Sequence, residues 1–176
     1  EVPIWKMEQR FVEPVKKVLA ERYEVDTHES LEDCLLNVAV TFVNDNYQDY
    51  LAELMEAKAG SLLEKLDEDN TRLQMLTALS YSVGYMLHIR SGLPGRAYFG
   101  NSLDKVCNFN TPEVISILGA AVSDMSEVLL REIAVLVQDL QREERNQNRT
   151  FEVPADSRYD VNRTATTEGS AEYGSD

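Results

Sequence analysis

Apolar residues recur at helical spacing along most of the chain, and this pattern predicts a series of α-helices. Near the N-terminus, Pro14 suits the first turn of a helix, where its missing N–H costs no hydrogen bond. The residues that follow it place apolar side chains on one face: Val15, Val18, Leu19 and Tyr23. The pattern therefore predicts a helix whose first turn holds Pro14 and which packs through this face.

A second helix is predicted to begin at Ser30, because Asp33 three residues later completes a pattern similar to a capping box. Apolar residues continue at helical spacing towards Gly60, a residue type that commonly ends a helix. The polar residues 44–46 interrupt this pattern. We expect them to kink the helix or to divide it in two.

The following helix is predicted over residues 73–89, after an acidic run that suits the positive end of a helix dipole. Within that run, Asp69 or Asn70 would cap the helix. Gly84, which lies among serines on the same helix, indicates the close approach of another helix. Glycine and proline residues at positions 92–95 end it.

The last helix has the clearest start, where a capping residue, Pro112 and an acidic residue follow one another. Its apolar residues extend over many turns: Val114, Leu118, Ala121, Met125, Val128, Leu129, Ile133, Leu136 and Leu140. Because this stripe is wide enough to pack against two neighbours, we expect the helix to be central. Ser123 and Ser126, near Gly119, indicate a close helix crossing.

These patterns together predict an all-α fold, an irregular multi-helix bundle around a long C-terminal helix. Residues 99–109 are expected to form a short irregular turn, and no alternating pattern indicates a strand. Residues 1–145 form the predicted helical domain. Residues 146–176, rich in polar residues, form the predicted linker or tail.

Charge is distributed unevenly along the 176 residues, whose formal net charge is −14. From position 24 to position 70 thirteen acids stand against only Lys58 and Lys65. This segment would repel phosphate, so we expect no direct binding of duplex DNA. A cluster of Arg142, Arg145 and Arg149 is the more plausible exception, although two glutamates lie within it. The acidic segment is either a solvated face or a docking surface for a basic protein partner.

Cysteine and histidine are too sparse and too scattered to suggest metal binding. Cys34 and Cys107 are expected to be reduced thiols of the core in a cytoplasmic protein. His28 and His88 are expected to have structural or solvent-exposed roles. No stretch is long and apolar enough to predict a membrane helix, so we expect no membrane partner.

Two pairs of acidic residues have a spacing that could bind a metal ion. Glu53 with Glu56, and Glu64 with Asp67, each share a helix face, and such pairs on adjacent helices can hold Mg²⁺ for pyrophosphate hydrolysis. Only seven residues separate the pairs, which leaves little room for antiparallel helices that face each other. A metal-dependent all-α nucleotide pyrophosphohydrolase therefore remains an alternative, and a solvated face is favoured.

Another polar group lies on the last helix, where Asp124, Glu127 and Arg131 share one face. We expect Arg131 to pair with Glu127 in a buried or half-buried network that sets helix register. The short motifs typical of phosphate loops, nucleophile elbows and zinc proteases are missing from the sequence. We accordingly predict no enzyme activity for this chain, with no catalytic, cofactor-binding or metal-binding residues and no cofactor.

Several segments resemble one family. They are Val2-Pro3-Ile4-Trp5, the pattern from Ser61 to Asn70 that contains Leu63, Leu66, Asp67 and Glu68, then Phe109-Asn110-Thr111-Pro112, Leu118-Gly119, Val122-Ser123-Asp124, Ser126-Glu127, Leu130-Arg131 and Ile133. Over residues 2–140 the chain resembles a helical segment of very large proteins encoded by bacterial conjugative elements. In that family the segment follows an antirestriction-like (ArdC-like) domain and precedes Swi/Snf-type helicase and adenine-specific DNA methyltransferase regions.

The resemblance implies a setting of DNA processing in mobile elements, and it implies no catalytic residues in this segment. We therefore expect a non-catalytic interaction or spacer module, whose partners are other domains of the same large protein or a basic protein. An acidic module that mimics DNA, with an antirestriction role, is a second alternative beside the hydrolase.

Overall fold

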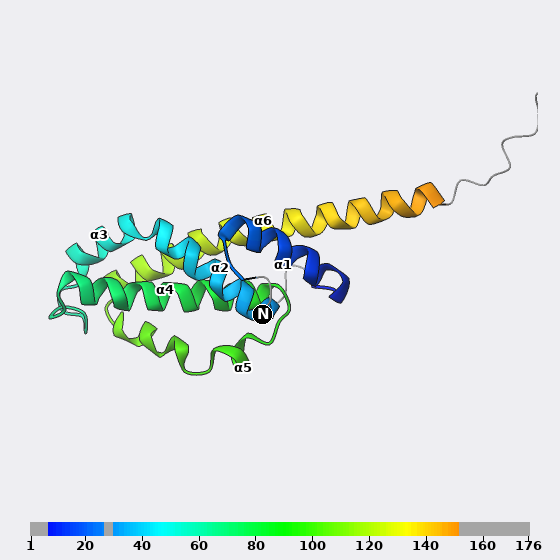
Figure 1. Cartoon of the computed structure of the whole chain (residues 1–176). Helices are drawn as coiled ribbons and strands as arrows, with labels where there is room; N and C mark the ends of the chain where they lie inside the picture. Colours follow the sequence, from blue (N-terminus) through cyan, green and yellow to red (C-terminus); the bar gives the residue numbers. More distant parts are fainter. Residues whose placement is uncertain (1–6, 27–29, 152–176) are drawn as a thin grey trace, which may run out of the picture. The chain divides into compact units, whose positions relative to one another are not determined.

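The computed structural model of the chain describes residues 7–26 and 30–151, and its elements are helical throughout these ranges (Figure 1). In chain order the elements are α1 (Gln9–Tyr23), α2 (Leu31–Asn46), α3 (Gln48–Ala57), α4 (Glu68–Arg90), α5 (Gly95–Phe99), the 3₁₀ helix η1 (Ser102–Asn108) and α6 (Pro112–Phe151). The predicted all-α multi-helix bundle is confirmed.

Helices α2 and α4 pack side by side and contribute much of the core (Figure 1). Gly84 of α4 is buried at this contact, where a Cβ atom would lie 2.9 Å from Leu36 Cδ1 and 3.3 Å from Phe99 Cζ. Leu36 belongs to α2 and Phe99 to α5, so the predicted close approach at Gly84 is confirmed.

The start of α2 matches its predicted cap. Ser30 Oγ accepts from the backbone N–H of Asp33 at 3.1 Å. The start of α4 differs from the prediction, because Asp67 is the N-cap and accepts from the backbone N–H of Asn70 at 2.8 Å. The residues predicted as caps, Asp69 and Asn70, instead lie inside the first turn. An aspartate at the N-cap accepts a hydrogen bond from the free backbone N–H three residues later. In α4 the aspartate in that position is Asp67.

The prediction for Pro14 was wrong in position, because α1 begins five residues earlier, at Gln9. Pro14 therefore lies inside the helix, at the point where its missing N–H removes one bond of the ladder. The extra turn buries Phe11, which is 4% exposed, and Arg10 lies over its ring at 4.7 Å from the centroid. Burial of this aromatic side chain offsets the lost hydrogen bond.

The division of the second predicted helix is confirmed, since α2 ends at Asn46 and α3 begins at Gln48. The side-chain amides of Asn44 and Asn46 donate to the carbonyls of Val40 and Phe42, each at 2.8 Å, and so bind the last turns of α2. Beyond α3 the chain turns through residues 58–66, with Gly60 at a φ of 78°.

Helix α6 supplies a row of buried side chains to the bundle: Val114, Leu118, Ala121, Met125, Leu129, Ile133 and Val137. The expected helix crossing is not found at Gly119, where a Cβ atom would meet nothing within 4 Å, or at Ser123, which is exposed. Of the three small residues, Ser126 is the one that is buried, at 2% exposure. A small residue permits close packing but does not cause it, and here the buried arc of α6 runs along its other side.

The chain divides into two units, residues 1–140 and residues 141–176. In the second unit, residues 141–151 continue α6, so the helix extends six residues past the predicted domain end at 145. The rest of the predicted tail, residues 152–176, lies outside the described residues. The stretch predicted as an irregular turn, residues 99–109, contains η1.

Candidate interaction surface

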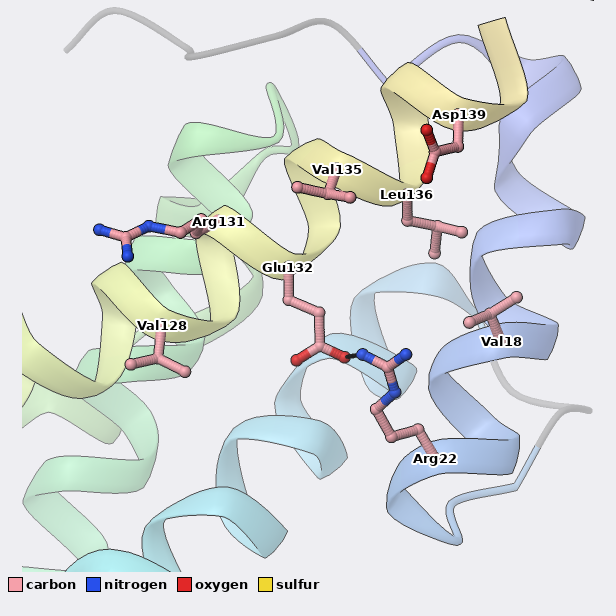
Figure 2. Close-up of a pocket in the computed structure, with 8 residues that line it drawn as sticks. All are labelled: Val18, Arg22, Val128, Arg131, Glu132, Val135, Leu136 and Asp139. Atoms are coloured by element: carbon pink, nitrogen blue, oxygen red, sulfur yellow. Dashed lines mark hydrogen bonds and ion pairs between the residues drawn. The ribbon is translucent and has the colours of Figure 1, made fainter. Parts of the chain in front are cut away.

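A hollow of about 400 Å³ opens between α1 and α6 within the first unit (Figure 2). Val18 of α1 and Leu136 of α6 lie on its apolar side, and Figure 2 shows these two side chains turned toward each other. Charged residues surround the apolar part: Arg22, Arg131, Glu132 and Asp139. An apolar hollow with charged side chains at its edge is a common form of protein-binding groove.

One ion pair joins the two walls of this hollow. Arg22 of α1 pairs with Glu132 of α6, and Tyr23 donates its hydroxyl to Glu132 Oε2 at 2.7 Å (Figure 2 draws the ion pair). The Glu132 side chain is only 20% exposed. Burial raises the pKa of Tyr23, and the bond to the Glu132 carboxylate raises it further. The two helices are thus held together by a charge-assisted contact at the edge of the hollow.

A second hollow, of about 410 Å³, lies between α4 and α6. Met86, Leu130 and Ala134 form its apolar lining, with Arg90 and Arg131 among its polar residues. Ser126 also lines it and is 2% exposed, and its Oγ has no hydrogen-bond partner among the described residues. Arg131 borders both hollows, which places them on opposite flanks of α6.

Along the arc that borders both hollows, α6 exposes a row of residues that we call the α6 face: Ala120, Asp124, Glu127, Val128, Arg131 and Val135. Val128 is 51% exposed and Val135 is 52% exposed. The prediction that Val128 belongs to the core was therefore wrong. Its position lies one residue before the buried Leu129, and a shift of one residue turns a side chain by about 100°.

The predicted pairing of Arg131 with Glu127 is confirmed, but the predicted burial of the pair is not. Their side chains are 73% and 66% exposed, because α6 presents this arc to solvent. Asp124 lies outside the pair, and its Oδ2 accepts from the hydroxyl of Tyr50 on α3 at 2.7 Å. That hydrogen bond raises the pKa of Tyr50 to about 12.

The four acids considered as a metal site have different local roles. Glu53 and Glu56 are exposed on α3. Glu64 Oε2 accepts from the backbone N–H of Gly60 at 3.0 Å, and Asp67 caps α4. In the described ranges, no group of three or more His, Cys, Asp or Glu residues could hold a metal ion.

His88 is fully buried at the end of α4, in contact with α5. Its Nδ1 lies 2.7 Å from the Gly84 carbonyl, and its ring stacks on Tyr98 at 4.9 Å between centroids. Burial lowers the pKa of His88, while the Gly84 carbonyl and the carboxylates of Glu32 and Asp33 act in the opposite direction. The predicted structural role of His88 agrees with this packing.

Cys34 is buried as predicted, whereas Cys107 is exposed on η1, so the prediction of a core thiol was wrong there. The 3₁₀ helix that carries Cys107 has no fully buried residue. Arg142 and Arg145 are exposed on α6, and Arg149 lies on the same helix. His28 lies outside the described residues.

Sequence reasoning missed Arg22 and Glu132, which are 110 residues apart in the chain. No local spacing relates them, and only the packing of α1 on α6 brings them together. In the described part of the chain, no helix is sufficiently long and apolar to cross a membrane. A comparison of the chain with protein families, curated proteins and solved structures found no match.

Proposed function

We propose that this chain is a non-catalytic interaction module of a larger, cytoplasmic, mobile-element DNA-processing protein. The observation that carries the proposal is the α6 face, where the half-exposed Val128 and Val135 line an apolar hollow. Apolar side chains that are exposed along a groove and rimmed by charged residues are typical of protein–protein contact sites.

The polar groups near this surface favour contact over chemistry. Glu132 is occupied by Arg22 and Tyr23, Asp124 by Tyr50, and Glu127 by Arg131. The resemblance of residues 2–140 to a segment of conjugative-element proteins supports the proposed setting. In that setting the partners would be neighbouring domains or other proteins of the same machinery.

A site-specific crosslink tests the proposal. A photoreactive amino acid at Val135 should crosslink to a protein in lysate of the native host, or to a flanking region of the parent protein. The same group at Lys105, exposed on η1, is the matched control. Equal crosslinking from both positions would refute a specific contact at the α6 face.

A second candidate, an acidic module that mimics DNA, is favoured by a different part of the surface. Exposed carboxylates gather on α3, on the turn after it and on the first turn of α4: Asp49, Glu53, Glu56, Glu64, Asp67, Glu68 and Asp69. A mimic would occupy the DNA site of a basic protein through such a row. Competition tests this candidate, because the chain would then displace labelled duplex DNA from a nuclease or repressor of the host.

A further inference from the structure

The α6 face is self-complementary when a second copy of the chain lies antiparallel to it. Along the helix the face carries its acids first, at Asp124 and Glu127, and its base last, at Arg131. All three side chains are exposed. An antiparallel copy reverses this order, so that Asp124 of each copy can meet Arg131 of the other, while Glu127, at the centre of the face, stays paired with Arg131 of its own copy.

The sizes of the side chains also differ between the two ends of the face. Ala120, near the N-terminal end, is small and exposed, and a Cβ at Gly119 beside it would meet nothing within 4 Å. Val135, near the C-terminal end, is large and 52% exposed. A twofold axis that passes between Glu127 and Val128 places Ala120 opposite Val135 of the second copy. The same axis places Asp124 opposite Arg131 of the second copy.

A parallel pair of the same helices lacks both kinds of match. Each residue would then lie opposite itself, so Arg131 would face Arg131 and Asp124 would face Asp124. Like charges opposite each other oppose association. The two copies of Ala120 would leave a gap at one end of the face, and the two copies of Val135 would crowd each other at the other end. Charge and size therefore select the antiparallel arrangement.

We infer that the α6 face is the contact surface of an antiparallel homodimer, in which Asp124 of each copy pairs with Arg131 of the other. The inference rests on the proposed interaction role, since it names the partner of the same surface. Val128 lies next to the axis and would be covered by the second copy. Asp124 accepts from Tyr50 at Oδ2, and its other oxygen can accept from Arg131 of the second copy. Arg131 has enough donors to keep its bond to Glu127 while it bonds this second carboxylate.

Charge reversal in analytical ultracentrifugation of the full chain tests the inference. The unchanged chain should dimerise reversibly as its concentration rises. Asp124→Arg alone, or Arg131→Asp alone, places like charges opposite each other twice and should weaken dimerisation about tenfold or more. The combined variant D124R/R131D restores both pairs and should dimerise as the unchanged chain does.

Mixing the two single variants is the decisive measurement. The D124R chain has arginine at both positions of the pair, and the R131D chain has aspartate at both. Opposite charges would therefore meet at each contact between the two chains, so the mixture should form a heterodimer although each variant dimerises weakly by itself. A mixture that associates no better than the separate variants would contradict the proposed pairing.

Asp104→Arg and Lys105→Asp, exposed on η1, are matched controls and should leave dimerisation unchanged. Both controls make the same changes of charge as the α6 variants, but they lie on a different element. Far-ultraviolet circular dichroism checks that every variant is folded.

A chain that stays monomeric at all concentrations, or single variants that dimerise as well as the unchanged chain, would overturn the inference. The proposed function would survive that result if Val135 still gave a specific crosslink to a different protein. A dimer that the controls disrupt as strongly as the α6 variants would likewise place the contact elsewhere.

Discussion

The hydroxyl of Tyr23 donates to Glu132 Oε2 at 2.7 Å and thereby joins the first helix of the bundle to the last. Arg22 pairs with the other oxygen of the same carboxylate. A single side chain of α6 thus holds the end of α1, and this carboxylate is largely shielded from water, being only 20% exposed. The contact explains how α1 and α6, which are far apart in the sequence, together form the walls of one hollow.

This contact predicts that two neighbouring residues of α6 differ in their effect on stability. Glu132→Ala should lower the free energy of unfolding by about 1–3 kcal/mol, because it leaves the Tyr23 hydroxyl and Arg22 without their shared acceptor. Arg131→Ala, whose ion pair is exposed, should cost about 0.5 kcal/mol or less. Urea unfolding at low protein concentration measures both, and equal losses would contradict the assignment.

Two glycines on helices should respond in opposite ways to substitution by alanine. Gly119→Ala fills open space on α6 and should stabilise the chain by about 0.5–1 kcal/mol through helix propensity. Gly84→Ala places a Cβ 2.9 Å from Leu36 Cδ1, so α2 or its side chain must shift. We expect a net loss of about 1 kcal/mol, since overpacking outweighs the propensity gain. Thermal unfolding of the two variants should move the melting temperature in opposite directions.

Stability should depend on pH through His88. Because burial lowers its pKa below the ordinary 6.5, the unfolded chain binds a proton more readily than the folded chain. The contribution of the neutral His88 ring to the free energy of unfolding is therefore fully present above pH 6.5. It declines as the pH falls below that value, by at most about 1.4 kcal/mol per pH unit. The groups that face the ring are Glu32 and Asp33 of α2, with Tyr98 and Phe99 of α5.

Unfolding measured from about pH 7 to about pH 5 checks this dependence, which His88→Gln should largely remove. His28→Gln is the control for the second histidine. If the slope persists in the His88 variant and disappears in the His28 variant, the assignment to the buried ring is wrong.

Divalent metal should have little effect on stability. Glu64 and Asp67 each accept from a backbone N–H, and so two of the four carboxylates of the hydrolase interpretation already stabilise local structure. Millimolar Mg²⁺ or Mn²⁺ should leave the melting temperature nearly unchanged. An ion present at about a hundred times its dissociation constant would add about 2.7 kcal/mol. A rise of several degrees that Glu53→Gln abolishes would revive the pyrophosphohydrolase interpretation.

The chain should not bind duplex DNA appreciably at physiological salt. The acidic surface of α3 and the start of α4 repels phosphate, and the arginines at 142, 145 and 149 share their stretch of α6 with Glu143 and Glu144. Fluorescence anisotropy with labelled single- and double-stranded DNA measures this over a range of salt. Micromolar binding that persists at physiological salt, and that alanines at the three arginines remove, would show a different role.

The sequence by itself determined several helix boundaries whose signals are local, although the local signals at Pro14 and at Asp69 or Asn70 misplaced two helix starts. The cap at Ser30, the break near Asn46 and the start at Pro112 each depend on side chains that act within a few residues of their own backbone. At these three places the local interaction agrees with the tertiary packing, so spacing alone was sufficient to predict them.

Tertiary structure decided which of these predicted faces is buried. Val128 and Leu129 are both large and apolar, yet packing buries Leu129 and leaves Val128 half exposed. The same holds for Pro14, which lies inside α1 because burial of Phe11 extends the helix toward the N-terminus. Glu132 finds Tyr23 only through the packing of α6 on α1, a contact between residues 109 apart in the chain. Helical periodicity identifies which side chains share a face, but the partner that covers a face comes from distant sequence. The exposure of the α6 face could therefore be recognised only in the folded chain.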